Sequence, residues 1–179
     1  MGPVMAQIRA AVADEAAALA ALAEHTFRDT FAATNSAADM ALHCARSYSP
    51  SIQRAEITDP AMATLVGVDA GELQAYAQLR LRHATPCVAL AKPAELQRIY
   101  VARQWQGRGL AQELLSAVLA LARGHGADGL WLGVWERNPR AIAFYAKHGF
   151  EACGEHVFQL GSDPQRDVVM ALRFGPAVR

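Results

Sequence analysis

The chain has few cysteines, almost no lysine and no net charge, and each shortage excludes a class of protein. Its three cysteines, Cys44, Cys87 and Cys153, lie far apart and form no CxxC pair. This spacing excludes a disulfide framework and a zinc site, and predicts reduced intracellular thiols. The 17 basic and 17 acidic residues cancel, so the chain lacks the basic surplus typical of proteins that bind nucleic acid or membrane surfaces.

Long apolar runs are also missing. None approaches the roughly 20 residues of a membrane span, and Asp14 and Glu15 come too early for a signal-peptide core. We therefore expect a cytoplasmic protein with no membrane, nucleic-acid or metal partner.

What the chain does have is enough apolar mass for a core. Apolar residues make up 53% of its 179 residues, although 38 of these are alanine. A chain of this length buries about 70% of its unfolded surface, so disorder is disfavoured. The length predicts a single domain over residues 1–179.

Hydrophobic periodicity predicts alternating strands and helices. Asp14 is expected to cap a first helix that ends near Thr26, and Ser36 with Asp39 resembles a capping box before a second helix. Strands are expected at 7–12, 62–68, 72–82, 96–101, 130–135, 152–159 and 167–174, helices at 37–47 and from 110 and 139, and loops at 48–60 and 85–93. Hairpins around a strand–helix–strand alternation predict a mixed α/β sheet.

The strongest chemical signal is a glycine-rich turn between a predicted strand and a helix. It reads Gln106-Gly107-Arg108-Gly109-Leu110-Ala111. Small residues let the backbone approach a bulky anion, and the helix start supplies free N–H groups. Pyrophosphate is therefore a candidate ligand, and a simple tight turn is the alternative. Gln112 occupies the last glycine position of a dinucleotide fingerprint, which argues against that fold.

A second signal covers residues 131–150. Asn138 ends a strand and caps a helix, and Tyr145 lies two turns along the same helix face. A phenol there could give a proton to a leaving thiolate. The alternative is that these aromatics only pack in the core, which we favour for Phe144 and Phe150.

Together, the two segments resemble the GNAT N-acetyltransferases. The first matches that family's Q/R-x-x-G-x-G/A loop, and the second its N-x-x-A-x-x-F-Y-x-K-x-G-F signature. The resemblance implies a mostly antiparallel sheet of six to seven strands, flanked by about four helices and splayed at two central parallel strands. It also implies acetyl-CoA as cosubstrate, with Tyr145 protonating the departing thiolate. The implied cofactor-binding residues are Ile99, Tyr100, Val101, Gln106, Gly107, Arg108, Gly109, Leu110, Ala111, Asn138, Ala141 and Tyr145.

A narrower resemblance, to the bacterial Pai-type polyamine acetyltransferases, extends over nearly the whole chain. It rests on residues 26–31 (TFRDTF) with Asn35-Ser36, on residues 96–101 (LQRIYV), and on residues 161–167 (GSDPQRD). Gln97, Ser162 and Arg166 depart from the pattern of that group. The departures leave open both the polyamine acceptor and the identity of the general base.

Direct transfer to an amine requires a group that removes its proton. Glu95, at the start of the central strand, is the candidate base acting through water; the alternatives are His25, His83 and His156 or a plain surface role. Asp29 and Phe31 are the candidate acceptor-binding residues.

Linear charge sums suggest a positive CoA stretch between Arg98 and Lys147 and a negative remainder that recognises a cationic amine. Two rival functions remain: a CoA-binding regulatory module without turnover, and a protein or peptide acetyltransferase. A homodimer is possible, since dimers are common in the family.

Overall fold

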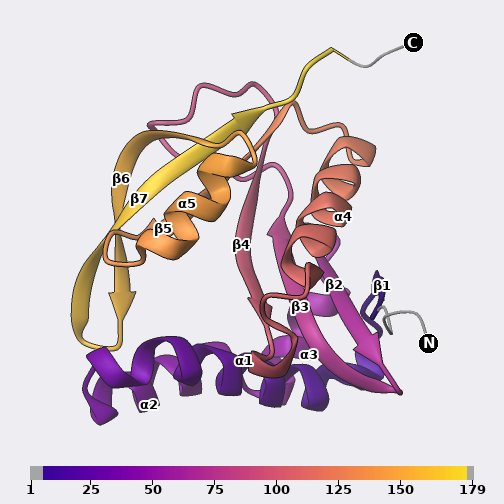
Figure 1. The fold of residues 1–179 in the computed structure, drawn as a ribbon, viewed down its shortest axis with the longest axis vertical. Helices are drawn as coiled ribbons and strands as arrows, with labels where there is room; N and C mark the ends of the chain where they lie inside the picture. Colours follow the sequence, from indigo (N-terminus) through magenta and orange to yellow (C-terminus); the bar gives the residue numbers. More distant parts are fainter. Residues whose placement is uncertain (1–5, 177–179) are drawn as a thin grey trace.

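The structure is a computed structural model that describes residues 6–176; the ends of the predicted domain, 1–5 and 177–179, lie outside that range. A seven-stranded sheet has the order β1-β2-β3-β4-β5-β7-β6 (Figure 1). The strands are β1 Gln7–Ala10, β2 Met62–Asp69, β3 Glu72–Arg80, β4 Pro93–Val101, β5 Gly129–Trp135, β6 Glu151–Leu160 and β7 Asp163–Arg173. The α-helices are α1 Ala16–Phe31, α2 Ala37–Ser47, α3 Pro50–Thr58, α4 Leu110–Gly124 and α5 Pro139–Lys147.

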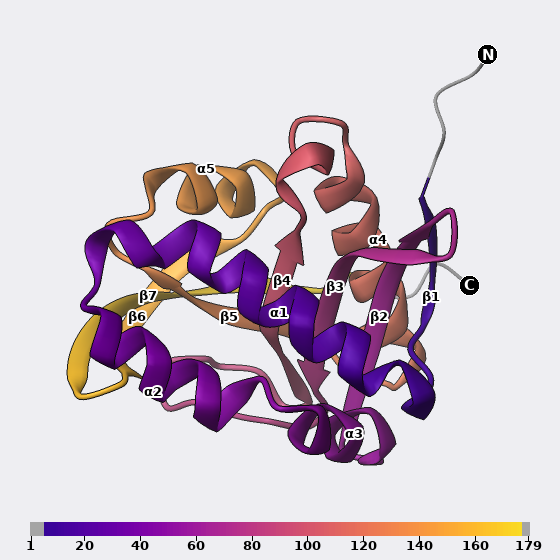
Figure 2. The same cartoon turned by 90° about the horizontal axis from the view of Figure 1, so that it is seen from below.

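Helices cover both faces of the sheet. Figure 2 shows α1, α2 and α3 on one face and α4 and α5 on the other. On the α4 face, the predicted stripe that includes Leu114 and Val118 is buried against Ala77 and Leu79 of β3. On the α1 face, the core contains aromatic as well as aliphatic side chains, with Phe27 packed near Tyr76. Six of the nine residues of β3 are buried, as expected for a strand covered on both sides.

One strand pair creates the opening that positions the site. All described neighbours in the sheet are antiparallel except β4 and β5, which run parallel. Their register covers only Pro93–Glu95 against Gly129–Trp131, after which the two strands part. The predicted mixed, mostly antiparallel and splayed sheet is confirmed.

The first helix was expected to end near Thr26, but α1 continues to Phe31. Two further local predictions were wrong. Residues 48–60 were expected as a loop, but Pro50–Thr58 form α3, because the Ser49 hydroxyl accepts a hydrogen bond from the Ile52 amide and Pro50 occupies the first helical position. Asp14 does not cap the first helix. A 3-10 turn, Ala13–Glu15, comes first, and Glu15 is the residue before α1.

Other local predictions were confirmed. Ser36 caps α2 by accepting from the Asp39 amide, and the helix covers Ala37–Ser47 as expected.

Within residues 6–176, no helix is both long and apolar enough to cross a membrane.

Candidate active site

A cavity of about 630 Å³ opens where β4 and β5 part. Its wall comes from α1, α2, β4, β5, α5, β6, β7 and the 81–92 segment between β3 and β4. The sequence-predicted site residues on this wall are Phe31, Glu95, Ile99, Tyr100, Asn138, Ala141 and Tyr145. The fold therefore brings together residues from β4, from the motif at residues 131–150 and from the N-terminal helix.

The glycine-rich turn lies outside this wall, at the start of α4. Gly107 and Gly109 have φ angles of +75° and +87°, a left-handed conformation that glycine adopts without a steric penalty. A Cβ on either residue would meet nothing within 4 Å. The first helical hydrogen bond runs from the Glu113 amide to the Gly109 carbonyl, so the preceding amides of the first turn have no helical partner.

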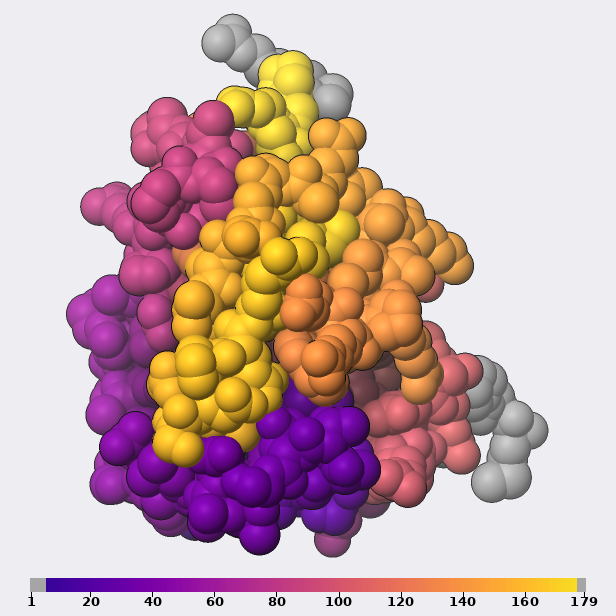
Figure 3. Space-filling model, turned by 90° about the vertical axis from the view of Figure 1, so that its left-hand side faces the viewer, coloured from indigo at the N-terminus to yellow at the C-terminus, as the bar shows by residue number. Residues whose placement is uncertain are grey.

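This geometry fits a phosphate group, because the loop offers open space, free amides and the positive end of a 15-residue helix. Figure 3 shows the molecular surface hollowed between α5, in orange, and the start of α4, in salmon. Gln106 holds the turn by donating to the Val101 carbonyl at 3.2 Å.

Tyr145 is buried on α5 and also lines the cavity. Its ring contacts Phe144 and Phe150 at centroid distances of 5.4 and 5.7 Å, and both phenylalanines pack in the α4-side core, as we predicted. Burial raises the pKa of the Tyr145 phenol well above its ordinary value. The hydroxyl therefore stays protonated across the physiological range, which is the state that a proton donor requires.

Glu95 also lines the cavity and is 8% exposed. Its Oε2 atom lies 3.6 Å from Arg80 Nε and 3.6 Å from His83 Nε2. Neither contact is a hydrogen bond, and this oxygen is buried without a hydrogen-bonding partner in the described structure. A buried carboxylate oxygen with free acceptor capacity can receive a proton from a bound amine or from water.

A histidine–aspartate pair faces the same cavity. His156 Nε2 of β6 lies 3.3 Å from Asp167 Oδ2 of β7, and the two residues are register partners. The hydrogen bond to the Asp167 carboxylate raises the pKa of the His156 imidazole. Gly133 of β5 makes room for the pair, because a Cβ there would lie 2.9 Å from Asp167 Oδ2.

Sequence reasoning named His156 among several candidate bases but missed Asp167 and Gly133. No sequence signal indicated Asp167, because the β6–β7 register, and no shared motif, places it opposite His156.

The raised pKa of His156 predicts a pH-dependent contribution to stability. A folded-state pKa above the unfolded value stabilises the fold fully below about pH 6.5, the ordinary histidine value, and the benefit disappears as pH rises through the folded pKa. We therefore expect Asp167→Asn to lower the free energy of unfolding more in mildly acidic than in alkaline buffer. Urea unfolding of both proteins at the two pH values measures this difference; an equal loss at both would contradict it.

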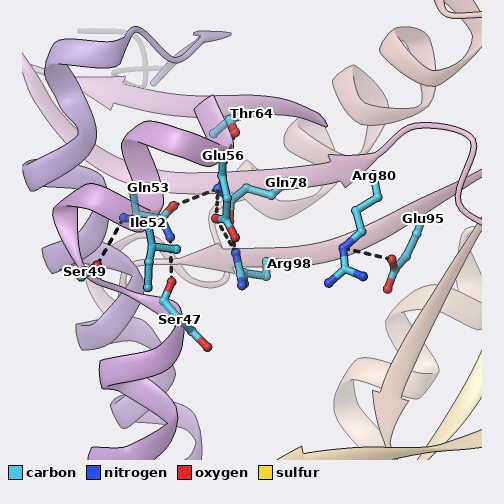
Figure 4. A network of polar contacts seen from close by, with 10 residues as sticks. All are labelled: Ser47, Ser49, Ile52, Gln53, Glu56, Thr64, Gln78, Arg80, Glu95 and Arg98. Atoms are coloured by element: carbon cyan, nitrogen blue, oxygen red, sulfur yellow. Dashed lines mark hydrogen bonds and ion pairs between the residues drawn. The ribbon is translucent and has the colours of Figure 1, made fainter. Parts of the chain in front are cut away.

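A buried polar network supports β4 beneath the cavity (Figure 4). Arg98 Nη1 donates to Glu56 Oε2 of α3 at 2.8 Å and to Gln78 Oε1 of β3 at 2.6 Å. Gln78 in turn donates to Gln53 at 2.9 Å. The Arg98 guanidinium also lies over the Tyr48 ring, 5.4 Å from its centroid. These contacts tie α3 to the central strands.

The network changes the charge argument made from the sequence. Arg98 was counted in the positive stretch of the sequence. Its side chain pairs with Glu56, which belongs to the negative remainder of the chain. The cavity wall carries Arg46, Arg80 and Arg98 against Glu95 and Asp167. Linear charge sums therefore do not describe the wall, which mixes both signs.

The two predicted acceptor-binding residues lie in different places. Phe31 lines the cavity, with its ring 5.8 Å from that of Trp135. Asp29 is not among the lining residues of the described structure; its carboxylate lies 3.4 Å from His25 Nε2 and 3.8 Å from Arg103 Nη2. Within residues 6–176, no group of three or more histidine, cysteine or acidic side chains could hold a metal ion.

Comparison with known proteins gives a consistent result. The Acetyltransferase (GNAT) family matches residues 18–150. An uncharacterized N-acetyltransferase in the pepI 3'region of Lactobacillus delbrueckii subsp. lactis is 35% identical over 151 residues, covering 84% of this chain and 87% of that protein. The spermine/spermidine N(1)-acetyltransferase of Bacillus subtilis is 33% identical over 61 residues, which are 34% of this chain and 40% of that protein.

Among solved structures, the PaiA N-acetyltransferase of Thermoplasma acidophilum in complex with coenzyme A is similar in fold. Its TM-score is 0.76 at 19% identity, and the match covers 94% of this chain and 98% of that one.

Proposed function

Because the chain belongs to the GNAT family and is an N-acetyltransferase, we propose that it transfers the acetyl group of acetyl-CoA directly to a primary amine of a small cationic acceptor. A polyamine is the first acceptor to test, in view of the partial likeness to the Bacillus subtilis spermine/spermidine enzyme. The observation that carries this proposal is the cavity between the diverging β4 and β5 strands, because it joins a proton donor and proton acceptors on one wall.

The chain's residues fit acetyl-CoA, which supplies an activated thioester. The free amides of residues 107–111 would hold the pyrophosphate; the Gln106 amide already donates to the Arg103 carbonyl at 3.2 Å. The edge of β4 at Ile99, Tyr100 and Val101 would pair with the pantetheine arm. This edge faces the gap, since the register between β4 and β5 ends at Glu95. Asn138 and Ala141, at the start of α5, would line the same channel.

The proposed proton transfers use two groups that line the cavity. Glu95 would accept a proton from the incoming ammonium through water, which frees the amine lone pair for attack. Tyr145 would give its proton to the departing thiolate, and its burial keeps that proton in place until the transfer. Phe31 would pack against the acceptor chain, and Asp29 would attract the acceptor from outside the cavity wall.

An amine panel with a mass readout tests the function. The panel pairs spermidine and putrescine with amino acids, an aminoglycoside and a peptide with a free N-terminus. We expect acetyl-CoA-dependent addition of one acetyl group to a small amine. Acetylation of the peptide alone would favour a protein acceptor, and tight CoA binding without any product would favour a regulatory module.

Glu95→Gln provides a test of the proton acceptor. The amide has nearly the shape of the carboxylate but cannot take up a proton, so we expect kcat/KM for the amine to fall by about 10² to 10⁴, the usual contribution of a general base. His156→Gln is the matched comparison: if that variant loses kcat/KM to this extent while Glu95→Gln retains it, the base is His156.

A further inference from the structure

Cys87 and Cys153 lie side by side although they are far apart in the sequence. Cys87 belongs to the 81–92 segment, and Cys153 lies in β6. A Cβ placed on Gly154 would be 2.6 Å from Cys87 Cβ and 2.8 Å from its Sγ. The Cys87 side chain therefore rests on the backbone of the residue next to Cys153. Figures 1 and 3 show the segment, in pink, beside β6, in orange-yellow.

A β-bulge places Cys153 toward the same point. The β6–β7 register shifts between Ala152 and Gly154, so Cys153 is the extra residue. Bulges redirect side chains relative to a regular strand. Cys153 Sγ lies 3.6 Å from the Val169 carbonyl oxygen, and Cys87 packs in the small apolar cluster that contains Val169. Both cysteine side chains therefore lie against Val169 of β7.

Both thiols are free, and they differ in accessibility. Cys153 is exposed and Cys87 half-buried, whereas Cys44 is buried within α2. Partial burial raises the pKa of the Cys153 thiol, and the adjacent Cys87 thiol raises it further. A raised pKa lowers the fraction of Cys153 present as thiolate at neutral pH. We therefore expect thiol–disulfide exchange at this site to accelerate with rising pH.

We propose that Cys87 and Cys153 form a redox-modification site, a reversible disulfide that ties the 81–92 segment to β6. With a low-molecular-weight disulfide as oxidant, the Cys153 thiolate attacks one sulfur, forms a mixed disulfide and releases one thiolate. The Cys87 thiolate then attacks the Cys153 sulfur and releases the second. The protein loses two electrons and two protons, and the oxidant is reduced to two thiols.

The cross-link would act on the part of the cavity wall near Glu95, because His83 Nε2 of the 81–92 segment lies 3.6 Å from Glu95 Oε2. Such regulation goes beyond the proposed reaction. The 81–92 segment contributes His83, Ala84 and Thr85 to the cavity wall, and β6 contributes His156 to the opposite side. The Trp131 indole already holds the segment by donating to the His83 carbonyl at 2.7 Å. A covalent tie restricts this wall further and leaves the start of α4 untouched.

The test oxidises the full chain with glutathione disulfide in mildly alkaline buffer and measures the intact mass. We expect the wild type and Cys44→Ala to lose two hydrogen atoms without retaining glutathione, and peptide mapping to join residue 87 to residue 153. Cys87→Ser and Cys153→Ser should show no such loss, and dithiothreitol should restore the wild-type mass. Circular dichroism of the reduced variants verifies that each is folded.

Stable glutathione adducts in place of the cross-link, a bond to Cys44, or a protein that stays fully reduced would overturn the proposal. These readouts need no turnover, so they stand even if no amine is acetylated. Where an amine is acetylated, the cross-linked wild type should have a lower kcat/KM for it, and Cys153→Ser should be insensitive to the oxidant. An unchanged kcat/KM would overturn the effect on the cavity.

Discussion

Tyr145→Phe should lower kcat by about 10² to 10⁴, the usual contribution of a positioned acid, while acetyl-CoA binding stays within a few-fold of wild type. The substitution removes one oxygen and keeps the ring, which packs between Phe144 and Phe150. The thiolate would then leave without a proton from the protein. Steady-state kinetics with a saturating amine, together with calorimetric titration of CoA, separates the two effects.

The position of Tyr145 makes a clean control available on the same helix. Phe144 is only partly buried and contacts Tyr145 without lining the cavity, so Phe144→Leu should disturb the packing near Tyr145 and keep the proton donor. We expect that variant to retain most of its kcat. A Tyr145→Phe enzyme with the wild-type kcat would remove Tyr145 from the acid role, and an equal loss in both variants would indicate a packing effect.

The motifs predicted the local geometry of two parts of the candidate site. The glycine-rich turn and Tyr145 could be located from sequence because each depends on local geometry: a left-handed turn before a helix, and a residue two turns beyond its cap. The strand pairing followed from hairpin spacing. These features are determined by neighbours along the chain, which is the information that a pattern contains.

Features that depend on contacts between distant segments could not be predicted in the same way. The helix at Pro50–Thr58 was missed because proline and serine are typical of both loops and helix starts, and its packing on α1 and β2 decides between them. The motif around Asp29 predicts an acceptor ligand, but it does not show that Arg103 lies 3.8 Å from the Asp29 carboxylate. Asp167 faces His156 only because of the β6–β7 register.

The ion pair between Arg98 and Glu56 predicts a large effect on stability. The two side chains are 12% and 18% exposed, and the pKa of the Arg98 guanidinium is raised by its anionic and phenolic neighbours despite the cost of burial. Glu56→Ala would leave that cation buried without its partner. We expect the free energy of unfolding to fall by about 3–5 kcal/mol, the cost of breaking a buried pair from one side, as measured by urea unfolding.

Two further variants distinguish the pair from a general effect of charge loss. Asp14→Ala removes the ion pair between Asp14 and Arg54, whose side chains are 96% and 57% exposed, respectively. This substitution should leave the free energy of unfolding almost unchanged. Glu56→Ala combined with Arg98→Met removes both buried charges, so it should recover part of the loss. If the double variant is less stable than Glu56→Ala, the arginine contributes through its contacts with Gln78 and Tyr48 more than through its charge pair.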